Sequence, residues 1–245
     1  MTDSAVVEGL KARVALACRV LEHLGMVDYL GHVSARIPAS DHLVMSPRGN
    51  ALGSLQAFTG AEMLVVDLDG QRVDGAHPVP SEVFIHTEIL RARPDVQSVV
   101  HTHQPMAVAF GLAGRPVAPA HHTGSTLLLR PVPVYDSPNL VVNPDKGRRV
   151  VAALGDHCLL QMRGHGVTAV GTSIEQAALN AIFFEQQATH NYRALQLGGL
   201  TVMSEAELSQ HVADLEEAAR TASDGGPWRY YTSLLPPAAD RREGA

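Results

Sequence analysis

The chain alternates short apolar runs with longer segments in which apolar residues recur at helical spacing, and this alternation limits the folds open to it. Helical spacing is clear at 4–25, where Gly25 ends the pattern. The other helices are predicted at 81–93, 104–112, 145–154, 173–197 and 204–221. Strands are predicted at 29–38, at 42–49 where the strand runs into a turn, in a hairpin at 63–73, at 96–103, and as a pair within 158–171.

Turn and cap residues set the expected ends of several elements. Asp69-Gly70 predicts the turn of the hairpin. Ser81 is predicted to cap the helix at 81–93, which Pro94 ends, and Ser173 is predicted to cap the longest helix. Because helices and strands intermingle, we predict one α/β domain over 1–245, a three-layer α/β/α fold with a central, mainly antiparallel sheet. Its core covers about 5–220, and 235–245 form a flexible tail.

Composition excludes several classes of protein. Hydrophobic residues make up 45% of the 245 residues, which is enough for a packed core and argues against disorder. The net charge is −6 without a basic block, so neither nucleic acid nor an anionic membrane is an expected partner. No signal peptide or membrane span is apparent. Cys18 and Cys158 are expected to be buried free thiols, and a cytoplasmic location follows.

A pair of histidines, His101 and His103, ends the predicted strand at 96–103. Residues two apart in a strand point to the same face, so the two imidazoles are expected side by side. Histidine is the commonest metal ligand, and the chain has 13 of them. The alternative is packing in the core, but each ring would then need partners for a donor and an acceptor. The spacing therefore favours a metal site.

Two further residues could complete a set of ligands. His165 lies in the turn Arg-Gly-His-Gly, where flanking glycines let the backbone bend and the ring project into a cleft. Glu82 opens a helix after a proline-rich loop, where the helix dipole favours a carboxylate. The plain alternatives are a histidine at a hairpin tip and an acid in a first helical turn. Three histidines with a carboxylate would leave room for substrate on the metal.

The remaining histidines carry weaker signals. His86 lies one helical turn after Glu82, as a partner of the metal ligands or, more simply, as a packed residue. His121 and His122 lie in a loop and are candidates for the same cleft, in this chain or in a neighbouring subunit. No partner can be argued for the others, which are His23, His42, His77, His157, His190 and His211.

Two loops have the residues of an anion clamp. Hydrogen-bond donors are available at His32 and Ser34 in the first loop, and Ser46, Arg48 and Gly49 form the second. A guanidinium at Arg48 suits bidentate capture of a carboxylate or phosphate. The alternative is a solvated arginine in a turn.

These motifs, in this order, resemble the class II aldolase/adducin family over residues 5–220. The matching stretches are Gly31-x-x-Ser34-x-Arg36, Ser46-Pro47-x-Gly49, Pro80-Ser81-Glu82 with a following His86, His101-Thr102-His103, and His165-Gly166 before the longest helix. The resemblance implies an α/β/α fold and a homotetramer with active sites between subunits. It also implies a divalent metal bound by His101, His103 and His165, with Glu82 as the acid/base residue.

The chain departs from the sugar-phosphate members at positions that hold their substrate. It has His32 in place of asparagine, Arg48 in place of threonine or serine, and Pro80 in place of a second serine. The loop with His121 and His122 lacks the tyrosine proton donor of the aldolases. These departures favour the family's other branch, the decarboxylases of aromatic acids with a hydroxyl beside the carboxylate.

We therefore expect a metal-dependent lyase that decarboxylates a hydroxy-aromatic dicarboxylate such as a dihydroxyphthalate. Each subunit would bind one divalent ion (zinc, manganese, iron or cobalt), with Glu82 as a fourth ligand, and no organic cofactor. Glu82 returns the proton to carbon, with His122 as the alternative donor. The predicted substrate-binding residues are His32, Ser34, Ser46, Arg48, Gly49 and Ser81.

Two other functions stay open. One is a class II aldolase or epimerase acting on a sugar phosphate or another hydroxy-carbonyl substrate. The other is an adducin-like interaction module without catalysis, which the presence of all the ligands disfavours. The aromatic residues Trp228, Tyr230 and Tyr231 either close over a neighbour's site or pack at a helix end.

Overall fold

The fold is built on a sheet of eight strands in the order β4-β3-β2-β1-β5-β8-β7-β6. The computed structural model describes residues 4–49, 53–221 and 226–236. Every pair of neighbouring strands is antiparallel except β6 and β7, which are parallel. The strands are β1 (His32–Arg36), β2 (His42–Met45), β3 (Leu64–Asp67), β4 (Arg72–Asp74), β5 (Ser98–Thr102), β6 (Val134–Tyr135), β7 (Leu159–Met162) and β8 (Gly166–Gly171).

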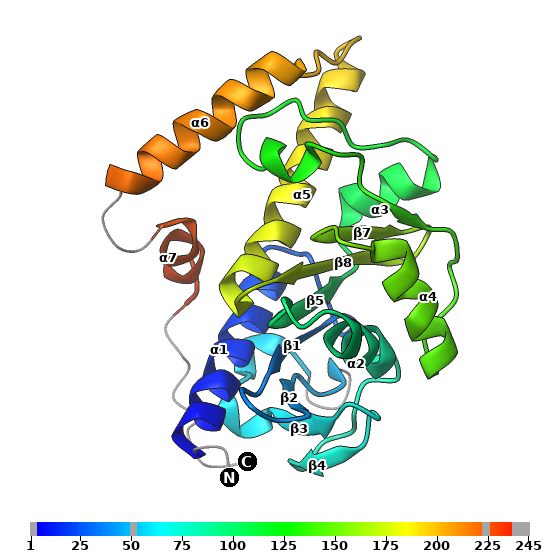
Figure 1. Cartoon of the computed structure of the whole chain (residues 1–245), viewed down its shortest axis with the longest axis vertical. Helices are drawn as coiled ribbons and strands as arrows, with labels where there is room; N and C mark the ends of the chain where they lie inside the picture. The colour runs from blue at the N-terminus through cyan, green and yellow to red at the C-terminus, as the bar shows by residue number, and fades with distance from the viewer. Residues whose placement is uncertain (1–3, 50–52, 222–225, 237–245) are drawn as a thin grey trace.

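Helices cover both faces of this sheet (Figure 1). Buried residues of α1, α3, α5 and α7 pack on one face, and those of α2 and α4 pack on the other. The α-helices are α1 (Ser4–His23), α2 (Val83–Ala92), α3 (Pro105–Leu112), α4 (Pro144–Leu154), α5 (Ile174–Gln196), α6 (Glu205–Thr221) and α7 (Gly226–Ser233). Short 3-10 helices are η2 (Leu55–Ala57), η3 (Gly60–Glu62) and η4 (Ser125–Leu128). The predicted three-layer α/β/α fold with a mainly antiparallel sheet is confirmed.

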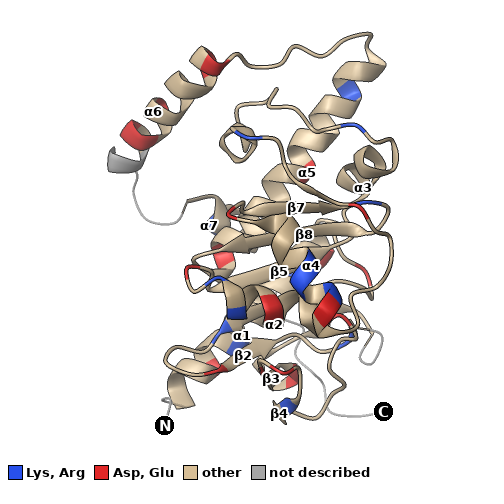
Figure 2. Cartoon of the chain, turned by 45° about the vertical axis from the view of Figure 1, so that its right-hand side comes forward, with Lys and Arg blue, Asp and Glu red and all other residues tan. Residues whose placement is uncertain are grey.

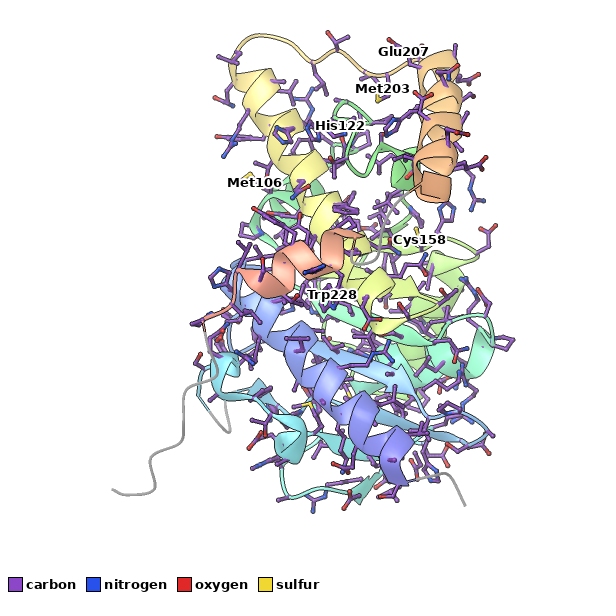
Figure 3. The ribbon with its side chains drawn as sticks, turned by 90° about the vertical axis from the view of Figure 1, so that its left-hand side faces the viewer. Met106, His122, Cys158, Met203, Glu207 and Trp228 are labelled. Atoms are coloured by element: carbon purple, nitrogen blue, oxygen red, sulfur yellow. The ribbon has the colours of Figure 1, made fainter. Side chains whose placement is uncertain are left out.

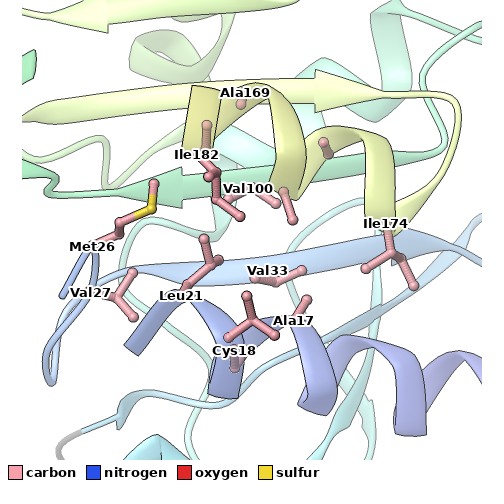
Figure 4. Close-up of a cluster of buried hydrophobic side chains, with 14 of the residues drawn as sticks. Ala17, Cys18, Leu21, Met26, Val27, Val33, Val100, Ala169, Ile174 and Ile182 are labelled. Carbon is pink, nitrogen blue, oxygen red and sulfur yellow. The ribbon is translucent and has the colours of Figure 1, made fainter. Parts of the chain in front are cut away.

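The strands alternate between two cores, as a sheet covered on both sides requires. In β5, Val99 belongs to the core under α2 and α4, whereas Val100 belongs to the core under α1 and α5. Figure 4 shows the second core, where Leu21 of α1 and Ile182 of α5 face Val33 and Val100 of the sheet. The same alternation turns His101 to the side of Val99, towards α2.

Several local predictions can be compared directly with the structure. Gly70 has a φ of +82° in the turn between β3 and β4, as the hairpin prediction required. The Ser173 hydroxyl accepts a hydrogen bond from the Gln176 N–H, so this predicted cap is confirmed. The cap predicted at Ser81 is wrong: Glu82 is the N-cap residue, and its side chain makes no capping bond. Residues 81 and 82 form a turn that precedes the helix.

The sequence pattern did not predict several elements whose sequence signal is weak. These are the two-residue strand β6, the 3-10 helices, and α7 near the end of the chain. Of the tail predicted at 235–245, residues 237–245 lie outside the described part of the chain. Cys18 is buried as predicted, but Cys158 is only partly buried.

Charged residues of both signs alternate over the elements around α2 and α4 (Figure 2). None of the described helices combines the length and the apolar character that a membrane crossing requires.

Candidate metal centre

Four side chains from three segments of the chain meet at one end of the central strands. His101 is the penultimate residue of β5 and His103 follows the strand, His165 lies in the turn between β7 and β8, and Glu82 precedes α2. One ligand atom from each residue lies within 4.8 Å of those of the other three. His101 Nε2 is 3.1 Å from His103 Nε2, and His165 Nε2 is 3.3 Å from Glu82 Oε2. The structure thus brings together all four residues expected to bind metal.

Two glycines let His165 reach this centre. Gly164 has a φ of +63°, a left-handed conformation that favours glycine. A Cβ at Gly166 would collide with the Thr102 carbonyl oxygen and come within 2.9 Å of the His103 ring. The turn can therefore bend because residue 164 is a glycine, and it can lie against the end of β5 because residue 166 has no side chain.

The segment that carries His103 is anchored to α5. The Gln104 side-chain amide donates to the Ala181 carbonyl at 3.2 Å. The Glu185 carboxylate accepts the N–H groups of Met106 and Ala107 at 2.8 and 2.9 Å, which satisfies the first turn of α3. These bonds fix the chain directly after His103, so the ring starts from a rigid backbone.

The donor set fits a divalent ion. Both ring nitrogens of His165 are buried and make no well-formed hydrogen bond among the described residues, since Nε2 has only its 3.3 Å contact with Glu82, although buried polar atoms are normally paired. Two nitrogens bound to one ion at about 2.1 Å lie roughly 3.0–3.4 Å apart, which matches the His101–His103 separation. Burial is the main cause that lowers the pKa of both His101 and His103, so neutral rings with a free lone pair are favoured.

Glu82 is held as a carboxylate. Burial raises its pKa, but the contact with His165 and the N–H of Val141, which donates to Oε1 at 2.8 Å, outweigh burial and lower the pKa overall. An ionised carboxylate beside three imidazoles suits a divalent cation better than it suits a dry core.

A cleft of about 340 Å³ opens onto this centre, a volume in the range of small-molecule sites. The predicted residues His32, Arg48, Gly49 and Ser81 line it together with Glu82, His103 and His165. Arg48 is exposed, and no carboxylate in the described part of the chain pairs with its guanidinium. The other lining residues are mostly apolar or small: Tyr29, Leu30, Gly31, Pro80, Leu140 and Gly164.

Ser34 and Ser46, predicted to contact substrate, do not line the cleft. Ser46 is 1% exposed, and its hydroxyl accepts the Val33 N–H at 3.0 Å. Ser34 is fully buried, and its hydroxyl contacts His86 Nδ1 at 2.7 Å. Both hydroxyls are engaged inside the protein, Ser46 with the backbone of β1 and Ser34 with His86 of α2.

His86 makes specific polar contacts in addition to the packing that its position predicted. It is fully buried between Ser34 and His32, and its Nε2 lies 2.7 Å from His32 Nδ1. The His32 ring in turn stacks on His101, with ring centroids 5.1 Å apart. Helical spacing showed that His86 shares a face with Glu82, but no local pattern could reveal its partners on β1.

His122 does not line the cleft of its own chain. It belongs to the loop between α3 and η4, and this loop lies in the space between α5 and α6 (Figure 3). His211 Nε2 of α6 contacts the His122 carbonyl at 2.8 Å. The His121 ring packs between those of His122 and His190, at centroid distances of 4.5 and 4.2 Å. Any contact of His122 with substrate would therefore involve another copy of the chain.

The C-terminal aromatic residues differ from one another in how far they are buried. Trp228 packs against the core of its own chain, beside α1 and α5 (Figure 3). Tyr231 is buried, and its hydroxyl accepts a hydrogen bond from the Gln186 side chain at 2.7 Å. Tyr230 is 60% exposed. Packing thus accounts for Trp228 and Tyr231, whereas Tyr230 faces outward.

Comparison with known proteins places this centre in a family. Residues 12–192 match the profile described as the class II aldolase and adducin N-terminal domain. The chain is 38% identical over 201 residues to a 3,4-dihydroxyphthalate decarboxylase of Arthrobacter keyseri, a match that covers 78% of this chain and 81% of the relative. It is 32% identical to the enzyme of that name from Rhodococcus jostii, over 91% and 95% of the two chains.

A solved structure agrees on the fold. The L-fuculose 1-phosphate aldolase of Glaciozyma antarctica superposes with a TM-score of 0.77 at 22% identity, over 96% of this chain and 89% of that one. The chain therefore belongs to the class II aldolase/adducin family and is a lyase.

Proposed function

We propose that this lyase decarboxylates a hydroxy-aromatic dicarboxylate, with 3,4-dihydroxyphthalate as the first candidate. The observation that carries the proposal is Arg48, whose guanidinium pairs with no carboxylate among the described residues and which lines the same cleft as Glu82, His103 and His165. Planar bidentate capture of a carboxylate is the task that arginine performs best. The names of the two relatives point to the same substrate.

The four donors would bind one divalent ion per subunit, and zinc, manganese, iron and cobalt all suit three nitrogens and one oxygen. When bound, the ion supplies Lewis acidity that stabilises the electron pair left on the ring as carbon dioxide departs. His101, His103 and His165 would hold the ion beside the cleft that Arg48 lines.

Arg48 would bind the substrate, and Glu82 would transfer the proton. Arg48 holds the carboxylate that stays on the ring, which fixes the orientation of the other carboxylate and the adjacent hydroxyl. Glu82 enters the reaction as a carboxylate and accepts the proton of that hydroxyl. The carbon–carbon bond to the reacting carboxylate then breaks, and its electron pair stays on the ring carbon. Glu82 returns its proton to that carbon, and the phenolate oxygen takes one proton from water.

The assembly is a further part of the proposal. A homotetramer in the cytoplasm, with sites between subunits, would let His122 of a second copy approach the cleft as an alternative proton donor. The elution and light scattering of the intact protein test this assembly directly. A monomer would exclude His122 from the reaction.

The test supplies the metal-loaded protein with 3,4-dihydroxyphthalate and, separately, with L-fuculose 1-phosphate. We expect carbon dioxide and 3,4-dihydroxybenzoate from the first and no aldehyde from the second. The Arg48→Ala variant should retain metal but lose affinity for the dicarboxylate, and Arg48→Lys should recover part of it. Aldehyde release from the sugar phosphate alone would replace this proposal with the aldolase alternative.

A further inference from the structure

Three buried side chains form a continuous line of hydrogen bonds that ends in the cleft. Ser34 Oγ lies 2.7 Å from His86 Nδ1, and His86 Nε2 lies 2.7 Å from His32 Nδ1. Ser34 and His86 are fully buried, and His32 is the member of the line that borders the cleft. With its Nδ1 engaged by His86, His32 has only Nε2 left for a ligand.

The direction of these bonds follows from the hydroxyl hydrogen of Ser34. Among the described residues, His86 is the hydrogen-bond partner of the Ser34 hydroxyl, and no other is present. If His86 Nδ1 carried the hydrogen, the hydroxyl hydrogen would be buried without an acceptor, which costs stability. Ser34 therefore donates to His86 Nδ1.

This direction determines the tautomers of both rings. An imidazole that accepts at Nδ1 carries its hydrogen at Nε2, so His86 donates from Nε2 to His32 Nδ1. His32 in turn accepts at Nδ1 and carries its hydrogen at Nε2. Burial lowers the pKa of His86 to about 3 and that of His32 well below its usual range, in keeping with one hydrogen on each ring.

We propose that Ser34 and His86 are positioning residues that fix His32 as a neutral donor, whose Nε2–H binds an oxygen of the carboxylate that stays on the substrate ring. The direction of the line rests on geometry alone, whereas the identity of the ligand rests on the proposed function. His32 would add a directed hydrogen bond to the charge of Arg48, which lines the same cleft. A ligand that offers a hydrogen instead of a lone pair at this point would be rejected.

The tautomers can be read without any substrate. Long-range ¹H–¹⁵N correlation spectra of the histidine rings, recorded on the metal-free and zinc-loaded protein, distinguish the two neutral forms. We expect the hydrogen on Nε2 in both His32 and His86. In Ser34→Ala, a one-atom change, His86 loses its donor and the single tautomer of His32 should give way to a mixture. Ser98→Ala is the matched control, because it removes another buried hydroxyl of the same sheet and leaves the line intact.

Binding measurements then test the ligand. His86→Gln keeps a donor for His32, and His86→Leu removes it. We expect His86→Leu to weaken the binding of 3,4-dihydroxyphthalate by about ten- to hundredfold, with the metal content unchanged. This is the range expected for the loss of a hydrogen bond to a charged group. His86→Gln should restore most of this affinity. Binding of 2,3-dihydroxybenzoate, which lacks the second carboxylate, should change little in either variant.

Each outcome bears on a different part of the inference. A hydrogen on Nδ1 of His32 in the wild type would overturn the direction of the line, even if the His86 variants fail to fold. Equal losses for both ligands would overturn the assignment to the remaining carboxylate. Failure to decarboxylate any hydroxy-aromatic acid would overturn the proposed function and leave the tautomer result standing.

Discussion

His165→Ala separates metal binding from packing more sharply than any other substitution in the centre. Both ring nitrogens of His165 are buried and make no well-formed hydrogen bond among the described residues, and Nε2 has only its 3.3 Å contact with Glu82. A histidine retained for packing should stabilise the protein whether or not metal is present. A ligand should stabilise it only through the metal.

The expected magnitudes follow from these two cases. Without metal, removing unpaired polar atoms relieves about 1–3 kcal/mol, and this offsets much of the cost of the cavity left by the ring. With metal at about 100 times its Kd, the wild type gains about 2.7 kcal/mol. For a chain of this size each kcal/mol raises the Tm by about 2–4 °C, so the metal should raise it by about 5–11 °C. In His165→Ala this rise should vanish at the same metal concentration.

The assay is thermal unfolding with added metal and with chelator, together with the metal content of each sample. His157→Ala is a matched control, since His157 is partly buried outside the centre. It should keep the full rise in Tm. If His165→Ala also keeps it, or if the metal-free variant unfolds far below the metal-free wild type, the assignment of His165 as a ligand is wrong.

Three other predictions concern separate groups. Glu82→Gln should lower kcat by about 10²–10⁴-fold with a smaller change in KM, as steady-state kinetics would show, and an unchanged kcat would exclude Glu82 as the acid/base residue. Burial lowers the pKa of His86 to about 3, below its unfolded value, so its contribution is present above pH 6.5 and is lost as the pH falls. Denaturant unfolding of the metal-free protein should thus show a steeper loss of stability below pH 6.5 than that of His86→Gln, by about 1.4 kcal/mol per pH unit, and equal slopes would contradict this cause. Burial raises the pKa of Cys18 to about 12, so mass spectrometry should find it unmodified after iodoacetamide treatment of the native protein at pH 8.

Sequence periodicity predicted the parts of the centre that depend on local geometry. The strand repeat of two residues put His101 and His103 side by side, and two glycines indicated that His165 could project from its turn. Each of these inferences uses neighbours in sequence. The same is true of the cap at Ser173.

The remaining features depend on contacts between distant segments. His86 meets Ser34 across 52 positions of sequence, and helical spacing alone could not show that β1 lies beneath α2. Ser46 and Arg48 are two residues apart in one predicted clamp, yet one is buried and the other is exposed, because both follow the end of β2 at Met45, where the strand repeat no longer relates their side chains. The position of His122 in a loop made it a candidate proton donor for the cleft. In its own chain, however, that loop lies beside α6.

The central claim is that the four donors bind a metal on which decarboxylation depends. Its most direct test is the release of labelled carbon dioxide from 3,4-dihydroxyphthalate, labelled in the carboxylate beside the hydroxyl, as metal is returned to chelator-treated protein. We predict that release rises in proportion to bound metal up to one ion per chain, with one 3,4-dihydroxybenzoate formed for each carbon dioxide. Release that is equally fast without metal, or absent from the fully loaded protein, would contradict the claim.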